Sequence, residues 1–501
     1  HPCRPWEPEG DVDWETPGRV GLYGAYNSVN YGYSYFDDRI RYQASSKVSL
    51  LAVKDPLGGT HDFKAGVEVN QTVWDQIQGY SGNTLYYDLN AIGYDPETFA
   101  NFYHYEITGP IKFRTSGSTW SAFVQDAWKP VNNFTLKYGT RFDHTVMRND
   151  LGEASVTGSM WGPRFMAAWD PFGDQRTKIA GGWGRFNDTG RLAISSYTSA
   201  SGYGQKLYVG EYFKDGQGLG FLNNAAGMAV IYPIENRNIA HDKLRMPKVD
   251  EVILQLQREV IQDVAVGIDF TGKFTRNLFE PDEMNLIWDE DGSSIIGSRE
   301  ADPQVSQGRL RTPNLARRDY YQIDIKAVKV DSRRWAGQLV YTYTTSVGSS
   351  VGALSGSFMN DPQTQFNYGP LTTDLRHVFK GYGYWNLPTD PWDQVISFYF
   401  AYFSGRPLER LYYGEENSTY DLRIFPRGIY HRYNPVWALN VQFQQDIDVR
   451  KGDFSLYVSA ENVFNNRAPA SLGYAFYTEN RLFAYSRQDP LQLMFGAKYS
   501  F

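Results

Sequence analysis

Hydrophobic and polar positions alternate along much of the chain with a period of two residues. In the last stretch, DPLQLMFGAKYSF, apolar or aromatic residues occupy every odd position from 491 to 501. The even positions between them are mostly polar or small. A period of two places successive side chains on opposite faces of a β-strand, so this stretch predicts a strand with one apolar face.

The same alternation recurs far from this stretch. It is clear in NFTLKYGTRFDH (133–144), DVAVGIDF (263–270), VWALNVQFQQDID (436–448) and DFSLYVSAEN (453–462). The sequence contains no helical stripe of comparable length, so it predicts an all-β fold.

Connectors rich in Pro, Gly, Asn and Asp separate these stretches, and short connectors alternate with long ones. The short connectors are 54–60, 129–133, 170–175, 260–263, 331–333, 387–393 and 448–452. The long connectors are 74–116, 147–157, 188–248, 277–315, 348–373, 406–432 and 466–487. Short turns at one end and long loops at the other are typical of outer-membrane barrels.

Between the connectors we count about sixteen predicted strands. They are 20–33, 37–53, 61–73, 117–128, 133–146, 158–169, 176–187, 249–259, 264–276, 316–330, 334–347, 374–386, 394–405, 433–447, 453–465 and 488–501. The predicted fold is a transmembrane antiparallel up-and-down β-barrel over residues 20–501, preceded by an N-terminal extension or linker at 1–19.

Composition agrees with a barrel that spans the outer membrane of a Gram-negative bacterium. Aromatic residues make up 16% of the chain, yet the mean hydropathy is −0.49. Strands with one apolar face and polar loops explain both values. No stretch approaches the ~18 apolar residues of a membrane-spanning helix. The net charge of −7, without a basic block, argues against nucleic acid as a partner.

The apolar face of the last predicted strand is expected to contact outer-membrane lipid. Its terminal aromatic residues, Tyr499 and Phe501, would lie in the interfacial girdle. A final strand that ends in Phe also resembles the signal read by the barrel assembly machinery, which is therefore an expected partner.

Six stretches, in order, resemble the TonB-dependent outer-membrane receptors, and some of them resemble the Oar-like branch. They are SAFVQDAWKPVNNFTLKYGTRFDH (121–144), GSMWGPRFMAAWDPFGDQRTKIAGGWGRFND (158–188), RMPKVDEVILQLQREV (245–260), TPNLARRDYYQIDIKAVKV (312–330), TTDLRHVFKGYGYWNLP (372–388) and SAENVFNNRAP (459–469). The resemblance covers about 40–501, which is nearly the whole chain.

This resemblance implies a 22-stranded barrel that is filled by a plug domain and carries a short box that contacts TonB. It also implies uptake of a nutrient ligand. We expect neither plug nor box within these residues, so TonB would act only through a plug segment absent from this chain.

The residues suggest no catalytic site, metal site or cofactor. The seven histidines form no HExxH pair, and DEDG (289–292) lacks the spacing of a calcium loop. No nucleophile elbow is present, so we do not expect an enzyme. The single cysteine, Cys3, is either inert or pairs with a partner chain or with an N-terminal segment outside these residues.

Aromatic residues cluster in two predicted loops, 195–213 and 411–433, where Tyr and Arg suit recognition surfaces. The alternative is ordinary packing of loops at the membrane interface. The candidate ligand-binding residues are Tyr203, Tyr208, Tyr212, Phe213, Tyr412, Tyr413, Tyr420, Arg427 and Tyr430.

The polar faces of the predicted strands should line a wet lumen or contact a plug. The candidate lumen-lining residues are Lys137, Arg141, Asp143, Gln442, Gln444, Asp446, Glu461 and Lys498. Any barrel of this size needs a wet lining, so these residues do not identify a ligand.

Three functions follow from these expectations. The first is a TonB-dependent receptor or transporter for a nutrient. The second is a structural barrel that anchors a surface assembly, or a surface or periplasmic protein partner, through its long loops. The third is a passive porin.

Overall fold

The computed structural model describes most of the predicted strands and parts of the loops between them. The described residues are 18–21, 27–28, 33–54, 56, 58–80, 84–88, 102–108, 111–190, 192–200, 206–215, 218–221, 228–230, 239–240, 244–290, 295–299, 308–352, 366–389, 393–408, 412–413, 421–422, 426–429, 431–449, 452–474 and 482–500.

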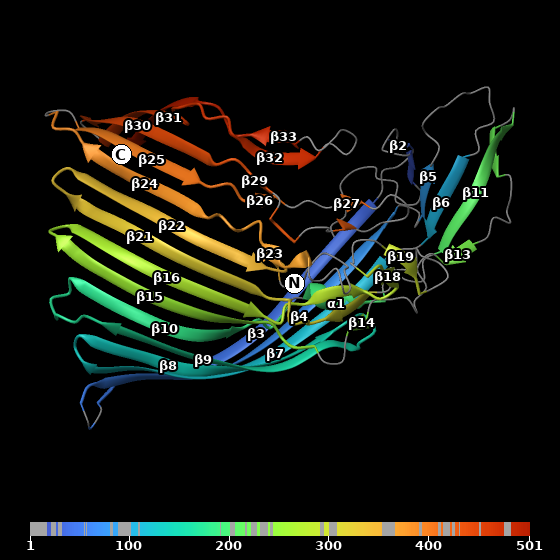
Figure 1. Cartoon of the computed structure of the whole chain (residues 1–501), viewed down its shortest axis with the longest axis horizontal. Coiled ribbons are helices and arrows are strands. Elements are labelled where there is room, and N and C mark those ends of the chain that lie inside the picture. The colour runs from blue at the N-terminus through green and yellow to red at the C-terminus, as the bar shows by residue number, and fades with distance from the viewer. Residues whose placement is uncertain are drawn as a thin grey trace.

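A 16-stranded antiparallel sheet dominates the structure (Figure 1). Fifteen strands follow one another along its path, and β23 (Gly369–Pro370) pairs beside β22. The path runs through β3 (Tyr33–Lys54), β4 (Thr60–Tyr80), β7 (Ile111–Val131), β8 (Phe134–Arg148), β9 (Ala154–Trp169), β10 (Thr177–Asn187), β15 (Lys248–Ile261), β16 (Val264–Arg276), β21 (Arg318–Ser332), β22 (Trp335–Gly348), β24 (His377–Asn386), β25 (Asp393–Phe403), β30 (Val436–Val449), β31 (Gly452–Glu461) and β34 (Gln492–Ser500).

These fifteen strands coincide with the last fifteen predicted strands, which confirms the up-and-down arrangement. The first predicted strand, 20–33, was wrong. The described parts of that segment, β1 (Gly18–Gly21) and β2 (Asn27–Ser28), pair with each other in a different sheet. β1 also pairs in parallel with β5 (Thr84–Asp88), a strand inside a connector that the sequence analysis took as a loop.

The two faces of the large sheet differ because side chains alternate along every strand. The short helix α1 (Leu192–Tyr197) lies against β4, β7, β8 and β9, and we call the face that it contacts the inner face. Met147 and the backbone of Gly117 belong to this face.

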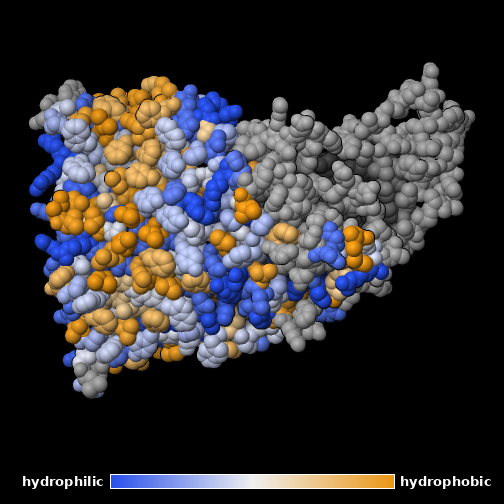
Figure 2. All heavy atoms as spheres, in the orientation of Figure 1, coloured by the Kyte–Doolittle hydropathy of each residue, from blue (hydrophilic) through white to orange (hydrophobic). Residues whose placement is uncertain are grey.

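The pairing register assigns residues of each strand to the outer face, and this face carries large exposed hydrophobic side chains. Val124, Trp161, Leu254, Ile325 and Phe495 each have between 53% and 75% of their surface exposed. Figure 2 shows hydrophobic side chains gathered over the half of the strands nearest the short turns, with hydrophilic side chains on either side. This is the expected belt of a sheet whose outer solvent is lipid.

The loops at the other end form smaller sheets. β12 (Gly218–Phe221), β11 (Lys206–Asp215), β6 (Phe102–Thr108), β5, β1 and β2 join in this order, and β13 (Met228–Val230) pairs with β11. The remaining loop strands are β14 (Ile239–Ala240), β17 (Glu280–Glu283), β18 (Leu286–Trp288), β19 (Ile295–Ser298), β20 (Gly308–Arg311), β26 (Pro407–Leu408), β27 (Tyr412–Tyr413), β28 (Asp421–Leu422), β29 (His431–Arg432), β32 (Pro469–Tyr474) and β33 (Leu482–Arg487).

Of the helical segments in the described part of the chain, none has the length and apolar character that crossing a membrane requires.

Candidate functional site

A compact apolar cluster lies where the long loops meet the inner face. Met147, Val156 and Met160 come from β8 and β9, and Ile194 comes from α1. The cluster, which we call the loop core, comprises Met147, Val156, Met160, Ile194, Met246, Phe279 and Leu310. Phe279 and Leu310 are completely buried, so segments from two separate connectors, β10–β15 and β16–β21, share one core with the wall of the barrel.

Hydrogen bonds fix the segment 188–200 to the strands beneath it. The Thr145 hydroxyl donates to the carbonyl oxygen of Thr189 over 3.3 Å. The Asn149 side-chain amide donates to the carbonyl oxygen of Thr198 over 3.0 Å. Gly190 has a φ of +82°, and a Cβ there would come within 2.2 Å of the Met147 methyl group. A glycine is therefore required for this close approach.

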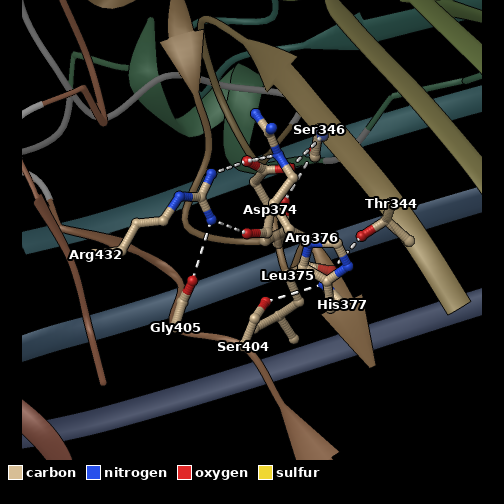
Figure 3. Close-up of polar contacts among 10 residues, drawn as sticks. Thr344, Ser346, Asp374, Leu375, Arg376, His377, Ser404, Gly405 and Arg432 are labelled. Carbon is tan, nitrogen blue, oxygen red and sulfur yellow. Dashed lines mark hydrogen bonds and ion pairs between the residues drawn. The ribbon is translucent and has the colours of Figure 1, made fainter. Parts of the chain in front are cut away.

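A buried carboxylate joins three loop segments at the same end of the sheet (Figure 3). The Asp374 side chain is completely buried. Its carboxylate accepts a hydrogen bond from the backbone N–H of Ser346 at 3.0 Å. The same carboxylate forms an ion pair with Arg376 Nε at 3.1 Å. Arg432 Nη2 forms a second ion pair with the same carboxylate.

Arg432 connects this carboxylate to the next loop. Its Nη1 donates to the carbonyl oxygen of Asp374 at 2.9 Å and to that of Gly405 at 3.1 Å. We call Ser346, Asp374, Arg376, Gly405 and Arg432 the Asp374 cluster. It ties the β22–β24 connector to the segment that follows β25 and to β29, because planar guanidinium groups match several oxygens at once.

Two buried carboxylates of β17, Glu280 and Asp282, make further contacts in the same region. Asp282, 3% exposed, pairs with Arg309 Nη2 at 2.8 Å and with Arg311 Nε at 3.4 Å. The amide of the buried Asn367 donates to Glu280 Oε1 at 3.4 Å. Buried charges need such partners, so these contacts fix how the loops pack. We call the Asp374 cluster together with the contacts of Asp282 and Glu280 the loop base.

Polar side chains cover the inner wall below the loops. Asp143, 3% exposed, accepts hydrogen bonds from Ser121 Oγ at 2.6 Å and Arg141 Nε at 2.7 Å. The Asn187 amide donates to its other oxygen at 3.0 Å, and Arg141 Nη2 reaches Glu68 at 3.2 Å. This network joins side chains of β4, β7, β8 and β10 across the inner wall and gives that wall a hydrophilic surface.

A pocket of about 810 Å³ lies against these strands towards the short turns. Its lining includes the cationic Lys64, Lys137, Arg141 and Arg164. Asp62 and Glu251 add negative charge to the same lining. The mixed charge suits a hydrated passage or a polar protein surface, and it does not select one ligand.

The predicted ligand residues fall in different places. Tyr208, Tyr212 and Phe213 lie in β11, and Tyr412 and Tyr413 form β27. Tyr203, Tyr420 and Tyr430 lie outside the described residues. Arg427 is 9% exposed, and its Nη1 donates to the carbonyl oxygen of Ser349 at 2.6 Å. This contact holds two loops together, while the ligand role of all nine residues stays a prediction.

The predicted lumen residues all lie on rows opposite the exposed hydrophobic side chains. Lys137, Arg141 and Asp143 share the inner row of β8 with Met147. Gln442, Gln444 and Asp446 alternate with Val441 and Phe443 on β30. Glu461 and Lys498 lie on the corresponding rows of β31 and β34. Their role as lumen-lining groups stays a prediction, as does the assembly role of Tyr499, on the outer row, and of Phe501, outside the described residues.

Sequence reasoning missed the groups that shape the loop base: Asp282, Ile194, Asp374 and Arg432. The only available signal was the charge-rich motif TTDLRH, which supported the resemblance but had no assigned role. Within the described ranges, no group of three His, Cys, Asp or Glu side chains could hold a metal ion.

Comparison with known proteins agrees with the two-faced sheet and its short turns. Residues 154–397 match the model of a family described as an outer membrane beta barrel domain. The chain is an outer-membrane β-barrel. The barrel lies in the outer membrane of a Gram-negative bacterium.

Among characterised proteins, the barrel is similar to the TonB-dependent transporter Oar of Myxococcus xanthus. The two are 24% identical over 394 residues, which is 68% of this chain and 36% of that protein. The barrel therefore spans about a third of the length of this relative.

Two solved structures show the same fold. The outer membrane transporter YddB from Escherichia coli aligns with a TM-score of 0.64 and 13% identity, over 98% of this chain and 58% of that one. The ferric citrate transporter FecA, in its unliganded form, aligns with a TM-score of 0.54 and 9% identity, over 93% of this chain and 55% of that one.

Proposed function

We propose that this barrel is the membrane-spanning part of a receptor that takes up a nutrient ligand in a TonB-dependent manner. The observation that carries the proposal is the segment 188–200, which folds onto the inner face and joins the loop core. A barrel whose own loop packs on its inner face, at the end where the long loops lie, suits regulated entry better than passive diffusion.

The rigid loop base supports the same function. The Asp374 cluster and the Asp282 ion pairs hold several loops in one arrangement, which lowers the entropy lost when a ligand binds. Above this base, the aromatic residues of β11 and β27 are the proposed ligand contacts. Below it, the polar inner wall is the proposed route, and the ligand is moved without being chemically changed.

Coupling to TonB is a proposal about the whole protein. Because the chain spans 36% of the Oar transporter, the plug and the TonB contact would lie in a part that these residues do not represent. The charged pocket on the inner face is the proposed contact surface for that plug.

A second candidate function is the anchoring of a protein partner. In the sheet built from β1, β2, β5, β6, β11, β12 and β13, five strands belong to the long loops, and β1 and β2 come from the segment before β3. A loop sheet of this kind offers an extended surface, so the ligand itself could be a macromolecule.

The proposal is tested by uptake in the native host. We would delete the gene, delete tonB separately, and measure uptake of an iron chelate, an oligosaccharide, a peptide and vitamin B12 at low concentration. We expect both deletions to abolish high-affinity uptake of one of these four probes.

Uptake that is lost on gene deletion but survives deletion of tonB would instead indicate a passive porin. Unchanged uptake of all four probes, together with a surface protein released on gene deletion, would support the anchoring function and overturn transport.

A further inference from the structure

An apolar groove crosses the outer face at β21, β22, β24 and β25. It has a volume of about 590 Å³. Its outer-row lining consists chiefly of Ala327, Trp335, Leu339, Trp385, Ile396 and Phe398. On this face the surrounding solvent is lipid, so the groove is a recess in the surface that the barrel presents to the bilayer.

The groove exists because glycines occupy adjacent positions on the outer row. Gly337 and Gly383 are paired across β22 and β24 on the outer row, which leaves the floor without side chains. Trp335 and Trp385 are paired directly across the same strands and form one wall. A Cβ on Gly383 would lie 2.8 Å from the carbonyl oxygen of Ala336 and 3.2 Å from the Phe398 ring, so the floor is closely fitted.

The groove lies next to a short turn. β21 and β22 are joined at Ser332 and Trp335, with only Arg333 and Arg334 between them. Short turns face the periplasm in outer-membrane barrels, and tryptophans favour the interface between hydrocarbon and headgroups. The groove therefore opens in the periplasmic leaflet, which consists of glycerophospholipids.

The residues of this turn are unusual for its geometry. Arg333 and Arg334 have φ values of 54° and 75°, so both adopt the left-handed conformation of a two-residue hairpin. Such turns strongly prefer Asn-Gly or Gly-Gly, because bulky side chains are disfavoured at positive φ. Two exposed arginines at these positions sacrifice local turn preference, which suggests that their charge serves a function.

Neighbouring groups leave the turn cationic at the rim of the groove. Lys329 lies 5.1 Å from the Trp335 ring, and its amine donates to the carbonyl oxygens of Val330 and Ser332. The carboxylate of Asp331 accepts a hydrogen bond from the Tyr384 hydroxyl. Arg334 makes one long contact, 3.4 Å, to the carbonyl oxygen of Leu387. Each guanidinium carries five N–H donors in a geometry that suits phosphate.

We propose that this groove is a binding site for a glycerophospholipid with an anionic headgroup. One acyl chain lies along the glycine floor between the tryptophans and Phe398, and Arg333 and Arg334 bind the phosphate. The inference concerns the lipid-facing surface, so it stands apart from the transport proposal and its test is independent of uptake.

The test compares lipid retention by the full-length protein purified from its membrane. The protein would be placed in nanodiscs that hold equal amounts of phosphatidylglycerol and phosphatidylcholine, extracted gently, and weighed by native mass spectrometry. We expect phosphatidylglycerol to stay bound about tenfold more often than phosphatidylcholine, since charge-assisted bonds to phosphate are strong.

Two variants test the arginines and the apolar groove separately. The double variant R333Q/R334Q should abolish the preference for phosphatidylglycerol, and A327L should fill the groove and reduce retention of both lipids. The control R176Q/K178Q removes two positive charges near another short turn, between β9 and β10, and should retain phosphatidylglycerol like the wild type. Heat-modifiable migration on gels would verify that each variant is folded.

Equal retention of the two lipids by the wild type would overturn the proposal. So would unchanged phosphatidylglycerol binding in folded R333Q/R334Q, or an equal loss in the control variant.

Discussion

At the scale of single residues, buried charges decide how the long loops are held. Asp374 has no exposed surface, yet it pairs with two arginines that each keep about a third of their side chain exposed. The carboxylate is thus removed from water and has a protein partner at each oxygen, whereas the two arginines reach the surface. The motif TTDLRH contains Asp374 and Arg376, but only the fold brings Arg432 to Asp374 from 58 residues away.

Replacement of Asp374 with Asn should loosen the loop base. The change removes the charge that Arg376 and Arg432 require, and we expect a local loss of about 1–3 kcal/mol because the bonds lost involve charged groups. Hydrogen exchange should rise in peptides covering 404–408 and 431–433. The control D448N alters an exposed carboxylate on β30 and should leave that exchange unchanged. Identical exchange in D374N and wild type would contradict the structural role of the cluster.

At the scale of elements, the strands and the loops obey different rules. The strands follow the alternation of their own sequence, and fifteen of them were predicted within a few residues. The short helix α1 carries no comparable stripe, since it spans only Leu192–Tyr197. It exists because Ile194 fills a gap between Met147 and its neighbours in the loop core.

The variant I194D should detach segment 188–200 from the inner face. Ile194 is 2% exposed, and an unpaired carboxylate placed there would cost several kcal/mol. We expect faster limited proteolysis within 188–200 and a larger single-channel conductance in planar bilayers.

A matched control is available on the same helix. Ala193 is exposed, so A193D adds the same charge without entering the loop core. If A193D and I194D changed proteolysis and conductance to the same degree, the charge itself would be responsible and the packing argument would be wrong.

At the scale of the whole molecule, the sheet has a lipid face and a wet face. The register carries this division from β7 to β34 without interruption, because the bulges lie near strand ends. In the described part of the chain, β3 and β34 each pair with one neighbour and form the edges of the sheet. Hydrocarbon offers no hydrogen-bond partners to the backbone groups of such edges, so we expect further strands to close the sheet. Closure into a barrel of 22 strands stays a prediction.

Adjacent residues on β7 provide a test of the two faces. Val124 lies on the outer row and is 53% exposed, whereas Gln125 lies on the inner row. V124R should reduce the free energy of folding into lipid vesicles by about 2–4 kcal/mol if it lies near the midplane. Q125R places the same side chain on the wet face and should change that free energy little. Equal costs for both variants would refute the assignment of faces.

The sequence by itself determined fifteen strands of the large sheet, their two faces and the sorting of short turns and long loops. Each of these depends on local chemistry: alternation with a period of two, and turn residues at fixed positions. The inner row of Lys137 and Arg141 was therefore readable from the polar pattern alone.

Only the tertiary structure decided what the loops do. β1 pairs with β5 rather than joining the barrel, and Arg427 bonds to Ser349 inside the loop base. The glycine-floored groove likewise depends on the register that pairs Gly337 with Gly383. These features arise from contacts between segments distant in sequence, and no local pattern of hydrophobic and polar residues encodes such contacts.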